Sequence, residues 1–469
     1  MIFDLNSVNQ YCFSEGVDSK NLMQRIVQIL EKTYYGDVRF DTGYSFGIGK
    51  TKTEENINTA SSTGLCIRIL SDNKWHYLGF NEIDEEKILS ETERLVRRLG
   101  NKSSKFVLQE PWEVDKEIKV REDPDNISIE EKVKTVREIY KRIIENEKIV
   151  NSVVAIAHAK NETIFMNTEG SVLRQVLPFF RFSMVAVARE GKRVEEDYFV
   201  LLKQGGYELF KYIDLDAKVQ DIVNSARELL TAKVLNGGGY DIIVDPEISG
   251  VIAHESFGHG CEADQVLRNR SYLADLKGKK IVSELVSMHD NSALKKERGY
   301  FVFDDEGVKS SDTVLVENGI LTHFLHDRQS AAFMNSDVTG NARSQDFSRK
   351  VYVRMSNTYV EPGDWKHDEL VEETKQGFYL IKALTGMEDP LGGNLQIVTH
   401  KAREIKDGEL GQLYKGVGIS GKVLEFLSNV DAVTDDFEMK GSGCGKGHED
   451  YVPVSSGGPY MRVRKAIIG

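Results

Sequence analysis

The alternation of apolar and polar positions divides the first half of the chain into amphipathic helices and runs of strand. In residues 18–33, Leu22, Ile26 and Leu30 recur at helical spacing, which predicts a helix with one buried face. Residues 37–81 have the pattern of strands instead. The same patterns predict further helices near residues 82–99 and 127–146 and a second strand meander over about 150–210. A helix followed by a meander thus occurs twice, but the similarity is too weak to define a repeat.

The second half begins with a clear helix and then becomes mostly strand. Residues 216–234 carry an apolar stripe that ends at a glycine-rich stretch, and we place the main domain boundary at this helix. A strand over 240–247 leads into 248–266, which has helical character. Further on, Asn318 and Gly319 are typical of a type I′ hairpin turn, and residues 419–430 predict a short helix. These assignments give an N-terminal domain of residues 1–225 and a C-terminal domain of residues 226–469.

Composition narrows the class of protein. The 469 residues include 61 Lys and Arg against 74 Asp and Glu, so the net charge is −13, which disfavours binding to nucleic acid. No apolar run approaches the roughly 18 residues that a membrane span needs, and no signal peptide is visible. The four cysteines lie far apart and do not form a disulfide pattern. We therefore expect a cytoplasmic protein that binds neither nucleic acid nor membrane.

The segment with the clearest chemical signature is HESFGH, residues 254–259. Two histidines and a glutamate occur together in zinc hydrolases, whose common motif spaces the histidines four residues apart on one helical face. Here the spacing is five, which turns the side chains about 140° apart on a regular helix. A one-residue bulge would bring them together, and Gly258 lowers the resistance to such a distortion. We therefore predict a bulged or kinked helix at Phe257–Gly258 that lets His254 and His259 bind one metal.

A catalytic metal site needs further groups beside two histidines. Glu255 directly follows the first histidine and would be the general base that takes a proton from water. Histidine and thiolate ligands suit Zn2+, although iron or cobalt would also bind them. The best distant third ligand is Cys444, because glycines on both sides let its backbone approach a metal closely. His448, four residues further on, is a competing ligand.

Three other interpretations stay open on the sequence alone. Cys444 could be the nucleophile of a cysteine hydrolase with His448 as its base, but this leaves residues 254–259 unexplained. His448 could instead be a fourth ligand that closes a purely structural metal site. The third interpretation is a non-enzymatic regulatory or binding protein that modulates a DNA enzyme. Such a protein would need a basic surface stripe, and the sequence offers only scattered basic groups, as at 295–298 and 462–465.

Several blocks of sequence, taken together and in order, resemble the TldD/PmbA family. The blocks are IIVDPE, GVIAHESFGHGCEAD, TGNAR (339–343), RMSNTYVEPG (354–363), GSGCGKG and VPVSSGGPYMRV. The resemblance is strong from about residue 238 to the end and looser before it. It implies an α+β fold with two domains. The N-terminal domain would combine helices with antiparallel strand meanders, and the C-terminal domain would be mostly antiparallel β and carry the bulged metal-binding helix.

The resemblance also implies an activity. Members of the TldD type are metalloproteases, and His254, His259 and Cys444 match their metal ligands, while Glu255 matches their catalytic glutamate. Such a chain is expected to form a dimer, as a heterodimer with a TldE/PmbA-like paralogue that lacks the metal motif. The pair would enclose a chamber that admits unfolded peptides. Bacterial members are linked to peptide maturation, and older names call them modulators of DNA gyrase.

Four further polar residues are weaker candidates. Asn341, Arg343 and Tyr359 lie in the family-like blocks and could stabilise an oxyanion or bind substrate. The resemblance does not imply His448 as a metal ligand. Its side chain could instead hydrogen-bond to a residue that binds the metal.

Overall fold

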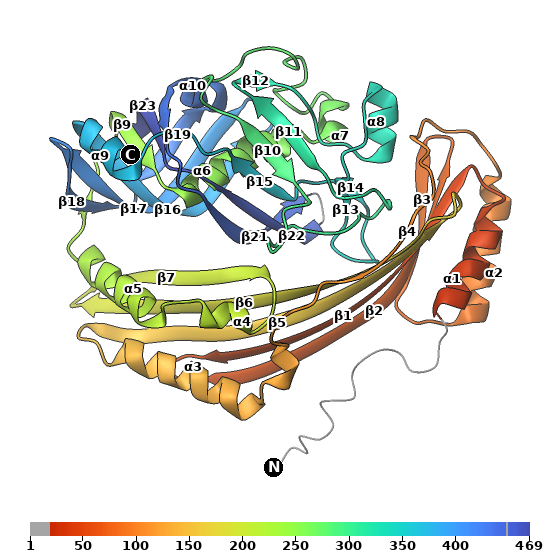
Figure 1. Cartoon of the computed structure of the whole chain (residues 1–469), viewed down its shortest axis with the longest axis horizontal. Coiled ribbons are helices and arrows are strands. Elements are labelled where there is room, and N and C mark those ends of the chain that lie inside the picture. The colour runs from red at the N-terminus through yellow and green to blue at the C-terminus, as the bar shows by residue number, and fades with distance from the viewer. Residues whose placement is uncertain (1–18, 447–448) are drawn as a thin grey trace.

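The N-terminal part of the chain is built around one long, curved sheet (Figure 1). In this computed structural model, which describes residues 19–446 and 449–469, the strand order is β3-β2-β1-β5-β6-β4, with β7 paired to β6. The elements are α1 (Ser19–Leu30), β1 (Tyr35–Lys50), β2 (Glu55–Ser71), β3 (Lys74–Phe80), α2 (Glu85–Leu99), β4 (Glu113–Glu117), α3 (Ile129–Ile144), β5 (Ile149–Asn167), β6 (Val172–Glu190), β7 (Arg193–Gln204), α4 (Glu208–Lys211) and α5 (Leu215–Leu229).

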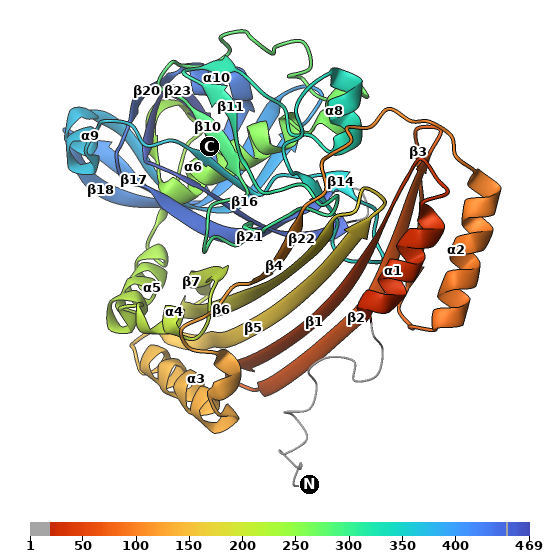
Figure 2. The same cartoon turned by 45° about the vertical axis from the view of Figure 1, so that its right-hand side comes forward.

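The two faces of this sheet have different side chains because successive residues of a strand point to opposite sides. Phe46, Ile156 and Phe182 lie on one face and form a core with Val136 of α3 and Val223 of α5. The other face carries small residues, including Ser45, Gly47, Ala60 and Ala157, and lies toward the C-terminal part of the chain. The sheet is therefore covered by helices on one face and by the rest of the molecule on the other (Figures 1 and 2).

The C-terminal part contains two larger sheets. Among the described residues one has the order β16-β9-β23-β19-β17-β18-β8, with β20 on β23, and the other β12-β11-β10-β15-β22-β21. The elements are β8 (Lys233–Val234), β9 (Gly238–Val244), α6 (Pro246–Ala253), η3 (His254–Gly258), α7 (Ala263–Val266), β10 (Met288–Asn291), β11 (Asp312–Glu317), β12 (Ile320–Leu321), α8 (Arg328–Met334), β13 (Ala342–Arg343), β14 (Tyr352–Val353), β15 (Asn357–Val360), α9 (His367–Glu373), β16 (Gln376–Asp389), β17 (Asn394–Lys406), β18 (Glu409–Lys415), β19 (Gly418–Lys422), α10 (Val423–Ser428), β20 (Val430–Val433), β21 (Glu438–Lys446), β22 (Glu449–Gly458) and β23 (Met461–Ile468).

Helix α6 lies between these two sheets, against β16 on one side and against β15, β21 and β22 on the other. Ile248, Ile252 and Ala253 are buried there in the largest hydrophobic cluster. A helix packed between two layers has to be apolar on nearly all sides, which explains the sequence PEISGVIA.

This architecture has the α+β character that the resemblance implies. Several helices expected from the sequence have different bounds in the structure. The helical segment 248–266 is interrupted at Cys261 and Glu262: α6 continues through the π-helical turn η3 to Gly260, and a separate short helix, α7, begins at Ala263. The helix expected over 419–430 is shorter, because residues 418–422 form strand β19. Asn318 and Gly319 have φ angles of 48° and 80°, as a type I′ turn requires.

The domain boundary expected between residues 225 and 226 falls inside α5 and stays a prediction. Within the described ranges, every helix is too short or too polar to cross a bilayer.

Candidate metal centre

Helix α6 brings His254 into the interior. Asp245 caps its N-terminus by accepting a hydrogen bond from the backbone N–H of Ile248 at 2.9 Å, and Pro246 occupies the first helical position. Because the helix is sandwiched between two sheets, His254 at its end is buried. Nδ1 of this histidine is enclosed and makes no hydrogen bond.

A π-helical turn follows directly. The backbone N–H of His259 donates to the carbonyl of His254, five residues back rather than four. The turn spans His254–Gly258, so it begins three residues before the distortion expected at Phe257–Gly258. It brings the two imidazole rings to a centroid distance of 5.3 Å. The i and i+5 side chains therefore lie together although a regular helix would separate them.

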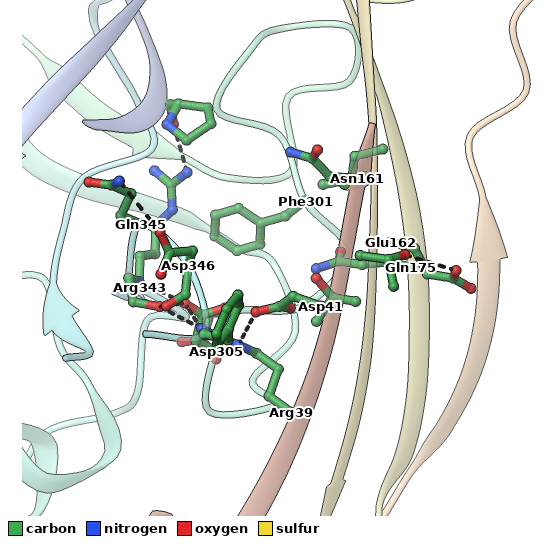
Figure 3. A pocket seen from close by; sticks show the side chains of 18 of the residues that line it. Arg39, Asp41, Asn161, Glu162, Gln175, Phe301, Asp305, Arg343, Gln345 and Asp346 are labelled. Carbon is green, nitrogen blue, oxygen red and sulfur yellow. Dashed lines mark hydrogen bonds and ion pairs between the residues drawn. The ribbon is translucent and has the colours of Figure 1, made fainter. Parts of the chain in front are cut away.

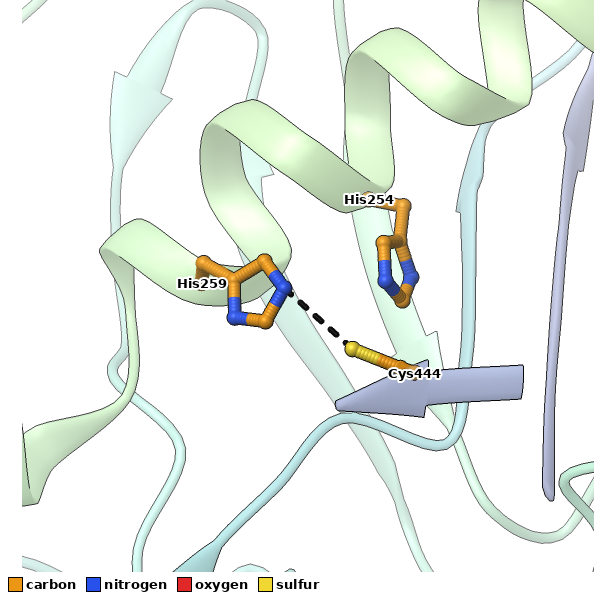
Figure 4. Close-up of side chains that lie close together, drawn as sticks. All are labelled: His254, His259 and Cys444. Atoms are coloured by element: carbon orange, nitrogen blue, oxygen red, sulfur yellow. Dashed lines mark hydrogen bonds between the residues drawn. The ribbon is translucent and has the colours of Figure 1, made fainter. Parts of the chain in front are cut away.

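Cys444 reaches the same place from strand β21, 185 residues further along the chain (Figure 4). Its Sγ lies 3.2 Å from Nε2 of His259. One donor atom from each of Cys444, His254 and His259 lies within 4.8 Å of the other two. A hydrogen bond also fixes the backbone of Cys444, because the buried Arg354 donates to its carbonyl at 2.7 Å.

The electrostatics of this group favour a thiolate. Burial opposes ionisation of Cys444, but the imidazoles of His254 and His259 outweigh it and lower the thiol pKa to about 4. Two imidazole nitrogens and a thiolate form a donor set that suits a zinc-like metal. The unpartnered Nδ1 of His254 fits such a role, since a buried polar atom normally has a partner.

Glu255 lies beside this group and packs against strand β16. At Gly386 the backbone approaches so closely that a Cβ there would lie 2.9 Å from Cγ of Glu255. Burial raises the pKa of Glu255, against the opposing effect of His254 and His259. Two residues further along β16, both carboxyl oxygens of Glu388 are buried without a hydrogen-bond partner, and burial raises its pKa to about 9.

Two charged residues that were not predicted support the centre. Glu262 is buried, and its Oε2 lies 3.5 Å from Nδ1 of His259. Lys446, two residues after Cys444, lies 2.9 Å from the same oxygen. Burial opposes ionisation of Glu262, but Lys446 and then His259 lower its pKa to about 2. The spacing of three residues between His259 and Glu262 was a signal that could have identified the glutamate.

The weaker sequence candidates have hydrogen-bond or stacking partners of their own. Asn341 donates to Oδ2 of Asp290 at 2.8 Å, and Tyr359 stacks on His289 with ring centroids 5.2 Å apart. Their proposed roles, like that of Arg343, stay predictions. His448 lies outside the described residues.

Arg343 is buried and donates to the carbonyls of Met355 and Pro453 at 2.7 and 2.6 Å. It lines a polar pocket of about 190 Å³ between the long sheet and the C-terminal part (Figure 3). Arg39 crosses this pocket to Asp305, with 2.6 Å between Nη1 and Oδ2.

Two family models assign most of the chain to one family of metallopeptidases. The model of the PmbA/TldA metallopeptidase C-terminal domain matches residues 237–469, and that of the central domain matches residues 122–232. The chain therefore belongs to the PmbA/TldD family of metalloproteases.

Relatives and solved structures extend over nearly the whole chain. A metalloprotease of Methanocaldococcus jannaschii is 34% identical over 94% of this chain and 98% of its own length. A zinc metalloprotease TldD homolog of Saccharolobus solfataricus is 27% identical over 93% of this chain and 96% of its own length. The structure of TldE from Thermococcus kodakarensis aligns with a TM-score of 0.76 at 18% identity, covering 96% and 99%. The structure of a putative modulator of DNA gyrase from Thermotoga maritima aligns with a TM-score of 0.80 at 19% identity, over 96% of this chain and 100% of its own. Both structures therefore share the fold of this chain.

Proposed function

We propose that this chain is a zinc-dependent peptidase in which His254, His259 and Cys444 hold the metal. The observation that carries the proposal is the convergence of these donors from two distant segments at a π-helical turn. Zinc bound there supplies Lewis-acid polarisation of a peptide carbonyl and a lowered pKa for water. The relative from S. solfataricus carries zinc in its name, which supports this choice of metal.

Glu255 is the proposed general base. It follows His254 on the π-helical turn, and Gly386 leaves just enough room for its side chain. We infer that its carboxylate takes a proton from the attacking water and passes it to the leaving amine. The raised pKa that burial gives Glu255 suits a group that has to hold a proton during the reaction.

The proposed substrate is an unfolded peptide in extended conformation. Strand β9 pairs with β16 only at Phe378–Leu380. Beyond it the Lys382 N–H donates to Asp245 and the Ala383 carbonyl accepts from Tyr198, and within the described residues no strand pairs with that edge over Leu384–Asp389. This free edge runs beside the turn that carries Glu255. A peptide that added a strand there would be held by its main chain, so we expect broad sequence tolerance.

We also propose that the C-terminal domain, residues 226–469, carries the chemistry and that the chain works as a dimer with a TldE/PmbA-like paralogue. The likeness to TldE supports only a common fold for the two partners. The fold neighbour from T. maritima is named as a putative modulator of DNA gyrase, but at 19% identity this likeness supports only a common fold.

The test is hydrolysis of an unstructured peptide, assayed with and without the purified paralogue. We expect Glu255→Gln to keep the parental zinc content and to lose roughly 10²- to 10⁴-fold in turnover, the usual contribution of a general base. Glu284→Gln is the matched control, because Glu284 is exposed and pairs with Lys280 on the surface. Parental turnover in Glu255→Gln would refute the general-base assignment.

A cysteine hydrolase is the one alternative with a specific observation in its favour. The thiol of Cys444 has a lowered pKa, and its Sγ lies 3.2 Å from Nε2 of His259. A cysteine nucleophile and its histidine base have the same arrangement. A chelator distinguishes the two: peptide cleavage that survives removal of metal, but not alkylation of Cys444, would favour this alternative.

A further inference from the structure

A fully buried arginine lies next to the residues that carry the metal donors. Arg354 directly follows strand β14, and its side chain has no exposed surface. The N–H groups on its Nε and Nη1 make no hydrogen bond among the described residues. A buried charge with unpaired donors destabilises a fold unless its other contacts compensate. Those contacts therefore indicate what the residue does.

The guanidinium of Arg354 contacts both segments of the metal centre. Its Nη2 donates a hydrogen bond to the carbonyl of Cys444 at 2.7 Å. Its Nε lies 3.7 Å from Oε1 of Glu262, in an ion pair whose two side chains are both buried. The other oxygen of Glu262, Oε2, lies 3.5 Å from Nδ1 of His259. Arg354 thus reaches Cys444 directly and His259 through one carboxylate.

The backbone of Arg354 is held by Asn341. The N–H of Arg354 donates to the carbonyl of Asn341 at 2.8 Å, and Nδ2 of Asn341 donates to the carbonyl of Arg354 at 2.9 Å. The same Nδ2 also donates to Oδ2 of Asp290 at 2.8 Å, and all three residues are buried. The point from which the guanidinium extends is therefore fixed on both sides.

We propose that Arg354 is a positioning residue that sets the distance between Cys444 and His259. These two donors come from different elements, so their spacing depends on contacts between the elements. A planar guanidinium presents its donors in a fixed fork and can hold two acceptors at one separation, whereas a lysine ammonium is a point charge on a flexible stem. The carboxylate of Glu262 in turn orients the ring of His259. The inference rests on the proposed metal site and extends it to a residue outside the donor set.

The test compares Arg354→Lys with Arg328→Lys. Both variants keep the positive charge and replace a fully buried arginine, but Arg328 pairs with Glu169, between β5 and β6. We would measure the zinc dissociation constant by competition with a chelator, the thiolate-to-metal absorption band of the cobalt(II) form, and thermal unfolding without metal.

We expect Arg354→Lys to bind zinc about tenfold more weakly and to shift the cobalt band, while Arg328→Lys matches the parent in both. Parental zinc affinity and cobalt spectrum in Arg354→Lys, with only a lower unfolding temperature, would overturn the inference and leave Arg354 a purely structural role. A parent that binds no zinc would instead refute the proposed metal site itself, so the two failures are distinguishable.

A second pair of variants covers the case in which Arg354→Lys does not fold. The double variant Arg354→Met, Glu262→Gln removes both charges of the buried pair, so neither is left uncompensated. It is compared with Glu262→Gln alone and should bind zinc several-fold more weakly, because the carbonyl of Cys444 has also lost its donor. Equal zinc affinity in these two variants would likewise overturn the inference.

Discussion

Single residues behind the metal donors decide how firmly those donors are held. His259 has Nε2 near Cys444 and Nδ1 near Glu262, so its two ring nitrogens face different partners. Lys446 joins Glu262 to the strand that carries Cys444. A carboxylate behind a ligating histidine fixes the orientation and tautomer of its ring. This arrangement makes Glu262 a strong determinant of metal affinity.

Glu262→Gln keeps the shape of the side chain and removes its charge. We expect the zinc dissociation constant to rise by about 10- to 100-fold, because His259 loses the carboxylate that orients its ring. Competition with a chromophoric chelator measures the change, with the surface variant Glu284→Gln in parallel. Equal affinities in the two variants would contradict the role given to Glu262.

His158 gives a prediction for stability at acid pH. It is buried, and its Nε2 lies 3.5 Å from Nζ of Lys132. Burial, and then the charge of Lys132, lower the pKa of His158 from 6.5 to about 4. The unfolded chain therefore binds a proton between these pH values that the folded chain does not, so stability is lost as the pH falls from about 6.5 to about 4.

The expected loss is up to about 3 kcal/mol over this range. Urea unfolding between pH 7 and pH 4 measures it. His158→Gln should flatten the dependence on pH, whereas the exposed control His323→Gln should keep the parental slope. An unchanged slope in His158→Gln would refute the assignment.

At the scale of elements, the metal centre depends on the close approach of the π-helical turn to strand β16. The approach is closest at Gly386, where a Cβ would lie 2.5 Å from Cγ1 of Val251 and 2.9 Å from Cγ of Glu255. Both distances are shorter than a carbon–carbon contact allows. A glycine is therefore needed at this position in the strand.

Gly386→Ala should displace either the Glu255 side chain or the strand edge beside it. We expect peptide turnover to fall at least about tenfold, because small displacements of a catalytic group have large effects on rate. The matched control is Gly411→Ala in β18, where the nearest atom to an added Cβ is 3.7 Å away. Turnover is measured under saturating zinc. Parental turnover in Gly386→Ala would show that the contact does not limit the reaction.

At the scale of the whole molecule, buried ion pairs join the long sheet to the C-terminal part. Arg68 of β2 is fully buried and pairs with Asp37 at 2.6 Å and with Glu306 at 3.4 Å. It also donates to the carbonyl of Asp305 at 3.1 Å. The sheet and the loop after residue 300 therefore share one charged cluster, which fixes their relative position.

Arg68→Met removes the cation and leaves the buried carboxylate of Asp37 without its ion pair. We expect a loss of about 3–5 kcal/mol in the free energy of unfolding, as for other buried pairs that lose one partner. The control is Arg94→Met, whose exposed pair with Glu91 should contribute less than about 1 kcal/mol. Denaturant unfolding measures both. A loss in Arg68→Met no larger than in the control would contradict this role.

The features that depend on nearby residues could be predicted from the sequence. The turn at Asn318 needs only two residues with positive φ, and the amphipathic stripe with Ile26 needs only a helical period. The conflict between the spacing of His254 and His259 and a regular helix was likewise visible, because it is a matter of local geometry.

Features that depend on distant pairing could not be predicted in the same way. No periodicity places Cys444 beside His259; that contact follows from the pairing of β21 with β22 and from the packing of β22 on α6. The same holds for Tyr272, whose hydroxyl donates a hydrogen bond to the carbonyl of Ser256 only because the chain folds back after α7. Strand pairing and loop packing bring together residues that carry no common local signal.

The most direct measurement is the zinc content of the purified chain and of His254→Ala, His259→Ala and Cys444→Ala after zinc supplementation. Cys66→Ala is the matched control, since Cys66 is also a buried free thiol. We expect about one zinc per chain in the parent and the control, and little in the three variants. A parent without zinc, or variants that retain the parental content, would contradict the proposal that these residues form the metal centre.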